Sequence, residues 1–195
     1  MSPRPQLDHI RKPQILGAAA EVIAERGVAA TRIADVAERV GSSAPAVLYW
    51  FGSKDELLAE ALTSPEDRFY AETTGRLKAL DRPRERLRLL IDEAVAGYDL
   101  ALWMELWTRA LRDEEAGAAR LRLDDRWRAE IEGIIRDGIE SGDFAAVDPR
   151  EAAIAIASLL DGLGVQVTLG DPNVSAETMR DLALRGAGMW LKCEL

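Results

Sequence analysis

The sequence TRIADVAERVGSSAPAVLYWFGSKDELL, from Thr31 to Leu58, decides the fold of this chain. It contains two short amphipathic segments separated by a tight turn, followed by the start of a third helix. In the first segment, apolar residues recur at the spacing of one helix face, and Gly41 ends it; these residues are Ile33, Val36, Ala37 and Val40. The order of elements is a helix-turn-helix pattern, which predicts double-stranded DNA as a partner.

Capping residues predict where the two helices begin and end. Thr31 is a suitable N-cap for the first helix, and Ser42 or Ser43 for the second. Pro45 falls in the first turn of the second helix, where a missing N–H costs little. We expect Val47 and Phe51 of this helix to face inward, and the opposite side to carry Ala44, Pro45, Leu48 and Tyr49.

The start of the next helix predicts a phosphate site. Ser53 and Glu56 have the spacing of a capping box. Lys54 stands at the first helical position, where a cation lies beside N–H groups that have no helical acceptor. Thr31 and Arg32, at the start of the first helix, are two further candidates for phosphate contacts.

The rest of the chain is predicted to be helical, without strands. A helix over 10–26 precedes the pattern, and Gly27 is its expected C-cap. Thr63-Ser64-Pro65 is expected to end or kink the helix that starts at Ser53. Further helices are predicted over 83–96, 98–112, 115–141, 149–169 and 175–192. We therefore expect an all-α chain with a small head and a larger helical body.

Composition limits the functions of this chain. Its 195 residues carry a net charge of -9, but residues 1–54 carry +2 and the remainder -11, as expected for a DNA-binding head on a body that avoids DNA. One Cys and one His are too few for a Cys/His zinc site, so no metal is expected. With His9 in the polar segment 1–9, which we interpret as a flexible arm, no catalytic triad is expected. We expect no cofactor, no enzymatic activity and no membrane partner, and a cytoplasmic protein.

Two features of the body are candidates for ligand binding and assembly. Small-molecule sites are mostly apolar and aromatic with a few polar groups. The aromatic group is a candidate of this kind; its members are Tyr98, Trp103, Met104, Trp107 and Trp127. Glu105, Arg109 and Asp161 are candidates for the polar groups, although Glu105 and Arg109 also have the i, i+4 spacing of an ion pair. An aromatic box with an acid would suit a cation.

The segment 149–169 is apolar nearly all round, and from residue 152 to 170 its only charged residue is Asp161. Such a helix is either buried in a core or shared with a partner. Asp161 is accordingly either a pocket residue or a polar group satisfied across an interface between subunits.

The head resembles the N-terminal domain of TetR-type (TetR/AcrR) regulators over residues 10 to 60. The match runs without a gap through Ile15-Leu16-Gly17-Ala18-Ala19, Gly27, Thr31, Val36-Ala37, Gly41, Ser43, Tyr49, Phe51 and Gly52-Ser53-Lys54-Asp55-Glu56-Leu57-Leu58. In the body, Trp103-Met104-Glu105-Leu106-Trp107, Asp125-Arg126-Trp127-Arg128 and Asp161-Gly162-Leu163 look like a common C-terminal subtype of these regulators.

The resemblance implies about nine helices, with a head at 10–60 and a ligand-binding and dimerisation domain at 61–195. It implies a homodimer formed through the last two long helices. The expected interface residues are Ile156, Leu159, Leu160, Leu163, Val167, Leu182 and Met189. It further implies a repressor that a small-molecule effector releases from a pseudo-palindromic operator.

The recognition helix departs from the family pattern. A Tyr commonly precedes the Phe by three residues, but here Leu48 holds that position and Tyr49 follows it, so Tyr49 is its candidate replacement. The predicted DNA-binding residues are Thr31, Arg32, Ser43, Ala44, Pro45, Ala46, Leu48, Tyr49 and Lys54. Because the reading face is mostly apolar, we hypothesise that it contacts thymine methyl groups and reads DNA shape. The alternative is a helical small-molecule-binding or protein-interaction module whose head no longer recognises an operator.

Overall fold

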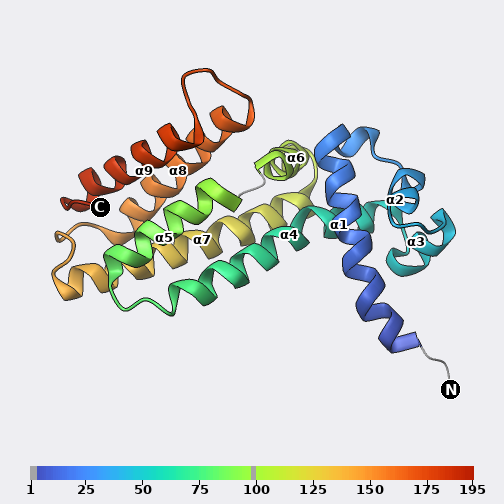
Figure 1. The fold of residues 1–195 in the computed structure, drawn as a ribbon, viewed down its shortest axis with the longest axis horizontal. Coiled ribbons are helices and arrows are strands. Elements are labelled where there is room, and N and C mark those ends of the chain that lie inside the picture. Colours follow the sequence, from blue (N-terminus) through green and yellow to red (C-terminus); the bar gives the residue numbers. More distant parts are fainter. Residues whose placement is uncertain (1–3, 98–99) are drawn as a thin grey trace. The chain divides into compact units, whose positions relative to one another are not determined.

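A computed structural model describes the backbone of residues 4–97 and 100–195, and the side chains of 12–96 and 100–195. Within these ranges the chain forms nine helices and no strand (Figure 1). The helices are α1 (Arg4–Ala30), α2 (Ile33–Arg39), α3 (Ala44–Phe51), α4 (Lys54–Leu77), α5 (Pro83–Gly97), α6 (Leu100–Ala110), α7 (Glu114–Ser141), α8 (Pro149–Thr168) and α9 (Ala176–Leu191). The all-α prediction is confirmed, and the bounds of the last five helices differ from the expected ones by at most two residues.

The chain divides into two compact units. The first comprises the chain up to Arg68 together with Ala101–Arg120, and thus holds α1 to α3, the first part of α4, most of α6 and the start of α7. The second comprises Phe69–Leu100 and Leu121–Leu195. Each unit has its own buried apolar residues, so each is described separately.

The core of the first unit joins α1, α2 and α3 to the start of α4. Its buried side chains include Val22, Ile23, Val36, Val47, Phe51, Leu57 and Leu58. Burying a side chain of this size contributes about 1.5–3 kcal/mol, so these few residues set how the short helices pack. Val47 and Phe51 face inward, as the sequence predicted.

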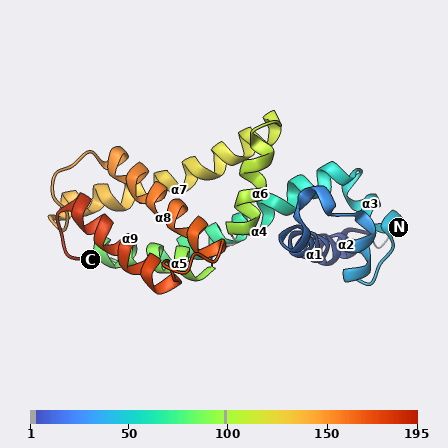
Figure 2. The same ribbon diagram turned by 90° about the horizontal axis from the view of Figure 1, so that it is seen from above.

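The core of the second unit lies between α5, the second part of α7, α8 and α9. Its fully buried side chains include Leu87, Ile91, Ile134, Ile135 and Ile156. Figures 1 and 2 show α8 and α9 side by side, and Gly186 of α9 allows this closeness, because a Cβ there would lie 2.5 Å from Leu159 Cδ2. In the described part of the chain, α8 is the one helix long and apolar enough to cross a membrane by length and composition alone, a test that core helices also pass.

Three predicted helix ends are wrong. The first helix begins at Arg4, not near residue 10, so Pro13 lies inside it and the expected arm overlaps its first six residues. Periodicity detected the buried face, whose first member among the described side chains is Ile15. α4 runs unbroken through Pro65, because buried apolar residues on both sides offset the hydrogen bond that proline removes.

The third error concerns Thr31. The N-cap of α2 is Arg32, which makes no side-chain cap. The Thr31 side chain is only 1% exposed, and its Oγ1 donates a hydrogen bond to the Gly27 carbonyl, 2.8 Å away. Its hydroxyl is therefore committed to the protein interior and is not placed to hold a phosphate.

Candidate nucleic-acid interface and effector site

The recognition helix α3 is formed by local signals that act as predicted. Ser43 Oγ accepts a hydrogen bond from the Ala46 N–H at 3.3 Å, which confirms Ser43 rather than Ser42 as the N-cap. Gly52, at φ 71°, ends the helix in a conformation that favours glycine. The outer face carries Tyr49, which is 70% exposed, and the exposed Pro45. Ala44, Ala46 and Leu48 are half-buried beside them.

The start of α4 forms half of the expected capping box. Ser53 Oγ accepts from the Glu56 N–H at 3.1 Å, whereas the Ser53 N–H is donated to the Phe51 carbonyl at 2.7 Å. Lys54 is the first residue of the helix, as predicted, and is half-buried. The positive end of the helix and the Lys54 ammonium group thus lie together at the α3–α4 turn.

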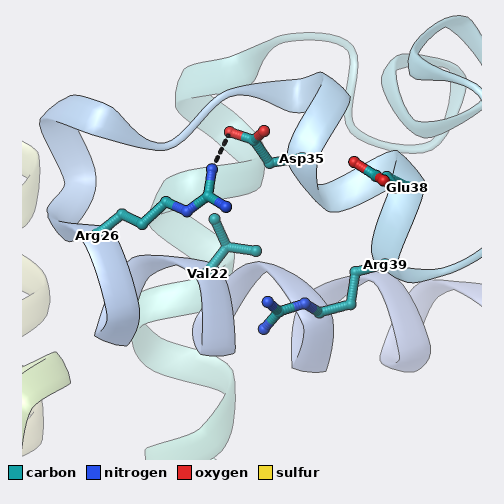
Figure 3. A pocket seen from close by; sticks show the side chains of 5 residues that line it. All are labelled: Val22, Arg26, Asp35, Glu38 and Arg39. Atoms are coloured by element: carbon teal, nitrogen blue, oxygen red, sulfur yellow. Dashed lines mark ion pairs between the residues drawn. The ribbon is translucent and has the colours of Figure 1, made fainter.

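Ion pairs join α2 to α1. Arg26 Nη1 lies 3.2 Å from Asp35 Oδ2, at a cavity of about 310 Å³ that is also lined by Val22 and Glu38 (Figure 3). Arg39 lines the same cavity and pairs with Glu25 at 2.8 Å. The hydrogen bond from Arg39 lowers the pKa of Glu25. These ion pairs hold α2 against α1.

The same pairs show which cations of the head remain available to DNA. Lys12 is also engaged, with Glu60 Oε2 at 2.8 Å and the Phe51 ring at 5.3 Å. Among the basic side chains of residues 12–60, only Arg32 and Lys54 have no acid of the described residues within ion-pair distance. Both lie at the start of a helix, and both were predicted to contact phosphate.

The described aromatic candidates fall into two groups. In the first unit, Trp103 and Trp107 of α6 have ring centroids 5.9 Å apart, and Met104 lies half-buried beside them on the same helix. In the second unit, Trp127 of α7 packs edge-on against Tyr70, with centroids 4.9 Å apart. Tyr98, the fifth candidate, lies outside the described residues.

Sequence reasoning missed the acid of the first group. Glu66 on α4 is only 7% exposed, and its Oε2 accepts a hydrogen bond from Trp103 Nε1 at 3.2 Å. A buried acid in contact with an indole is the chemistry that binds organic cations. One signal was present in the sequence: Glu66 follows Leu58 and Leu62 at i, i+4 and i+8, and so places an acid on the apolar face of its helix.

The Trp127 group contains a cation of the protein itself. The Arg126 guanidinium lies 4.0 Å above the Tyr70 ring, and the Tyr70 hydroxyl donates to Glu130 Oε2 at 3.4 Å. Burial, followed by the charge of Glu130, raises the pKa of Tyr70. An aromatic face that already carries a guanidinium is a poorer candidate for a second cation.

Two of the other polar candidates of the body, Glu105 and Arg109, bind partners that the sequence did not predict. Arg109 pairs with Asp113 at 2.7 Å rather than with Glu105. Glu105 Oε2 instead accepts from the Val28 N–H at 3.0 Å. Asp161 is half-buried, and its pKa is raised to about 6, first by burial and then by Asp124, against the opposing effect of Arg128.

The structure alters the predicted dimer interface. Ile156 is 1% exposed, and Leu160 is also buried, so both belong to the core of one subunit and their prediction as interface residues is wrong. A helix that is apolar all round buries one face within its own fold, and periodicity does not say which. Leu159, Leu163 and Val167 are half-buried, and the large apolar side chains exposed on α8 and α9 are Ile154, Leu182, Met189 and Trp190.

These features define a helix-turn-helix regulator with a helical body, and comparison with known proteins agrees. Residues 15–61 match the model of the tetR family of bacterial regulatory proteins, and residues 83–191 match the C-terminal domain of BetI-type transcriptional repressors. The chain therefore belongs to the TetR family. It is a transcriptional regulator with an N-terminal DNA-binding domain and a C-terminal ligand-binding domain.

Relatives match along nearly the whole chain. The regulator BetI of Vibrio parahaemolyticus is 27% identical to this chain, and the match covers 91% of this chain and 90% of that regulator. A transcriptional regulator from Saccharomonospora viridis, crystallised in complex with choline, is 30% identical with a TM-score of 0.83, and the match covers 89% of this chain and 93% of that one. A TetR regulator from Haloarcula marismortui superposes with a TM-score of 0.84 at 27% identity, covering 93% and 98% of the two chains.

Proposed function

We propose that this regulator is a homodimeric repressor that a small quaternary ammonium compound releases from a pseudo-palindromic operator. Residues 10–60 form the DNA-reading head, and 61–195 the effector-binding and dimerisation body. Choline is the first candidate effector, because a regulator 30% identical to this chain was crystallised with it. Since the operator is chromosomal, the protein acts in the cytoplasm.

The buried contact between Glu66 and Trp103 is the observation that carries the effector class. A quaternary ammonium group has no N–H to donate, so it is recognised by aromatic faces and a negative charge. Glu66 supplies the acid, and Trp103 and Trp107 supply the rings. Choline bound here would take the position of the indole N–H beside the carboxylate.

The operator contacts divide into positioning and reading groups. Arg32 and Lys54, each at the start of a helix, hold phosphates and set the orientation of the head. Tyr49 and Pro45 reach the base edges with the neighbouring residues Ala44, Ala46 and Leu48. An apolar face of this kind reads thymine methyl groups and groove shape rather than guanine.

The Lys54→Ala variant tests the phosphate contact. It is expected to weaken binding to all DNA fragments and to reduce the slope of log affinity against log salt by about 0.9 per head, because one fewer counterion is released. Titration of a labelled operator at four salt concentrations measures the slope. The matched control is Lys78→Ala, which removes a cation from an exposed position just beyond α4. An unaltered slope in Lys54→Ala would exclude the contact.

The proposed dimer uses the exposed apolar face of α8 and α9. Met189 is 80% exposed, and Leu182 lies seven residues before it on the same helix face. Large apolar side chains exposed on two adjacent helices support an interface there. A second copy of the chain is its proposed occupant, as expected for the family.

Two charges on this face are expected to separate the subunits. Wild-type protein at micromolar concentration should sediment at twice the 21.4 kDa mass of the chain, and the double variant Leu182→Glu/Met189→Glu as a monomer. Leu111→Glu, which alters an exposed leucine of the first unit, should remain dimeric. A monomeric wild type, or a double variant that still dimerises, contradicts the proposal.

Retention of genomic fragments by the purified protein at two salt concentrations, with and without choline, tests the function as a whole. Enrichment of a palindrome, lost when choline is added, is the expected result. No enrichment at low salt would favour the alternative, a helical module that binds small molecules or proteins without reading an operator. Enrichment that choline leaves unchanged would retain the regulator and reject this effector.

A further inference from the structure

A break in α1 receives its hydrogen-bond partner from α6. Gly27 has φ 76° and ψ 160°, a non-helical backbone conformation inside α1 that residues other than glycine rarely adopt. The Val28 N–H, directly after the break, is donated to Glu105 Oε2 at 3.0 Å. A Cβ on residue 27 would lie 3.1 Å from Glu105 Oε1, so the carboxylate also packs against the glycine. Glu105 thus caps the last segment of α1.

This segment leads directly into the DNA-reading helices. Thr31 Oγ1 donates to the Gly27 carbonyl at 2.8 Å, and the Thr31 N–H donates to the Val28 carbonyl at 3.3 Å. Thr31 is buried, and Arg32 after it is the N-cap of α2. A displacement of Glu105 therefore reaches α2 through the short segment 27–31, which the two hydrogen bonds of Thr31 to Gly27 and Val28 hold together.

Glu105 also lies on the helix that carries the proposed effector site. Trp103 and Trp107 are four residues apart and share one face of α6, whereas Glu105, two residues from each, lies on the opposite face. Because a helix of 11 residues moves as a unit, a rotation or shift that changes the contact between Trp103 and Glu66 also moves the Glu105 carboxylate. All of these contacts lie within the first unit.

We propose that Glu105 couples effector occupancy to the head: its cap on Val28 is made in the DNA-binding conformation and is released when an organic cation takes the Glu66 carboxylate from Trp103. This inference rests on the proposed function. An effector shifts such an equilibrium only by the difference in its affinity for the two conformations, and by reciprocity operator DNA must favour the capped one.

The test compares Glu105→Ala, which removes the acceptor, with Glu105→Gln, whose amide oxygen still accepts from Val28. In wild type, saturating choline should raise the operator Kd by about 10-fold or more, within the usual range of allosteric coupling. In Glu105→Ala the ratio of the operator Kd with choline to the operator Kd without it should fall below about 2-fold, while calorimetry shows that choline still binds. Glu105→Gln should retain most of the ratio. Glu114→Ala, which removes an exposed acid at the start of α7, is the control.

Hydrogen exchange at the Val28 amide of the wild-type dimer gives a measurement that does not depend on a variant folding. Operator DNA should slow this exchange by about 10-fold, and choline should accelerate it. Full coupling in Glu105→Ala, or a Val28 exchange rate that operator DNA leaves unchanged, overturns the inference. If wild type does not bind choline, the effector proposal fails, and the exchange rate with and without operator DNA still decides the role of Glu105.

Discussion

Replacing Glu66 with glutamine is expected to weaken choline binding by about 100-fold, or about 2.7 kcal/mol. Glutamine has nearly the same shape and its oxygen can still accept from Trp103 Nε1, so only the charge is removed. A cation about 5 Å from a carboxylate, at an effective dielectric constant of about 20, is attracted by about 3 kcal/mol, and part of this offsets the loss of hydration. Isothermal calorimetry of the two proteins measures the difference.

A neutral ligand separates the charge effect from packing. Dimethylbutanol, the carbon isostere of choline, should bind wild type and Glu66→Gln with affinities within about 3-fold, so that the loss appears only for the charged ligand. Glu72→Gln, at an exposed position on the same helix, should bind choline as wild type does. An equal loss for both ligands would show that Glu66 supports the fold and does not bind the cation.

Replacing Asp161 with asparagine is expected to stabilise the protein above pH 7 by up to about 3 kcal/mol. The pKa of Asp161 is raised from 3.8 to about 6, so the folded state binds the proton more tightly than the unfolded state. The free energy of unfolding therefore falls as the pH rises from about 4 to about 6. Above that range the whole of this loss remains. Asparagine stays neutral, so it avoids both the burial of a charge and the repulsion from Asp124.

Urea unfolding at pH 4 and pH 8 measures this effect as the difference between the two proteins. Wild type and Asp161→Asn should have similar stability near pH 4. At pH 8 Asp161→Asn should be more stable than wild type, with a Tm several degrees higher. Other carboxylates titrate in both proteins and cancel in the difference. Asp81→Asn, which alters an exposed loop residue, should show no such change. A loss of stability at pH 8 would mean that attraction to Arg128 outweighs burial.

The head was predictable because its signals are local. Ser43, Gly52 and Ser53 act on backbone groups within a few residues, so the sequence shows both the residue and its target. Thr31 was predicted wrongly for the opposite reason: its hydroxyl turns inward to the Gly27 carbonyl at a break that periodicity does not reveal. The interface prediction failed at Ile156 because a buried and a shared helix face have the same composition.

The sequence by itself determined the helix-turn-helix from Thr31 to Leu58, the all-helical body and the positions of Arg32 and Lys54 at helix starts. The tertiary structure alone decided which partners the carboxylates of Glu105 and Glu66 bind. Glu105 has a basic residue at the correct helical spacing, yet it caps Val28, 77 residues away, and Glu66 meets Trp103 across 37 residues. Local spacing fixes which partners a side chain can reach within one helix, but the packing of helices decides which partner it binds.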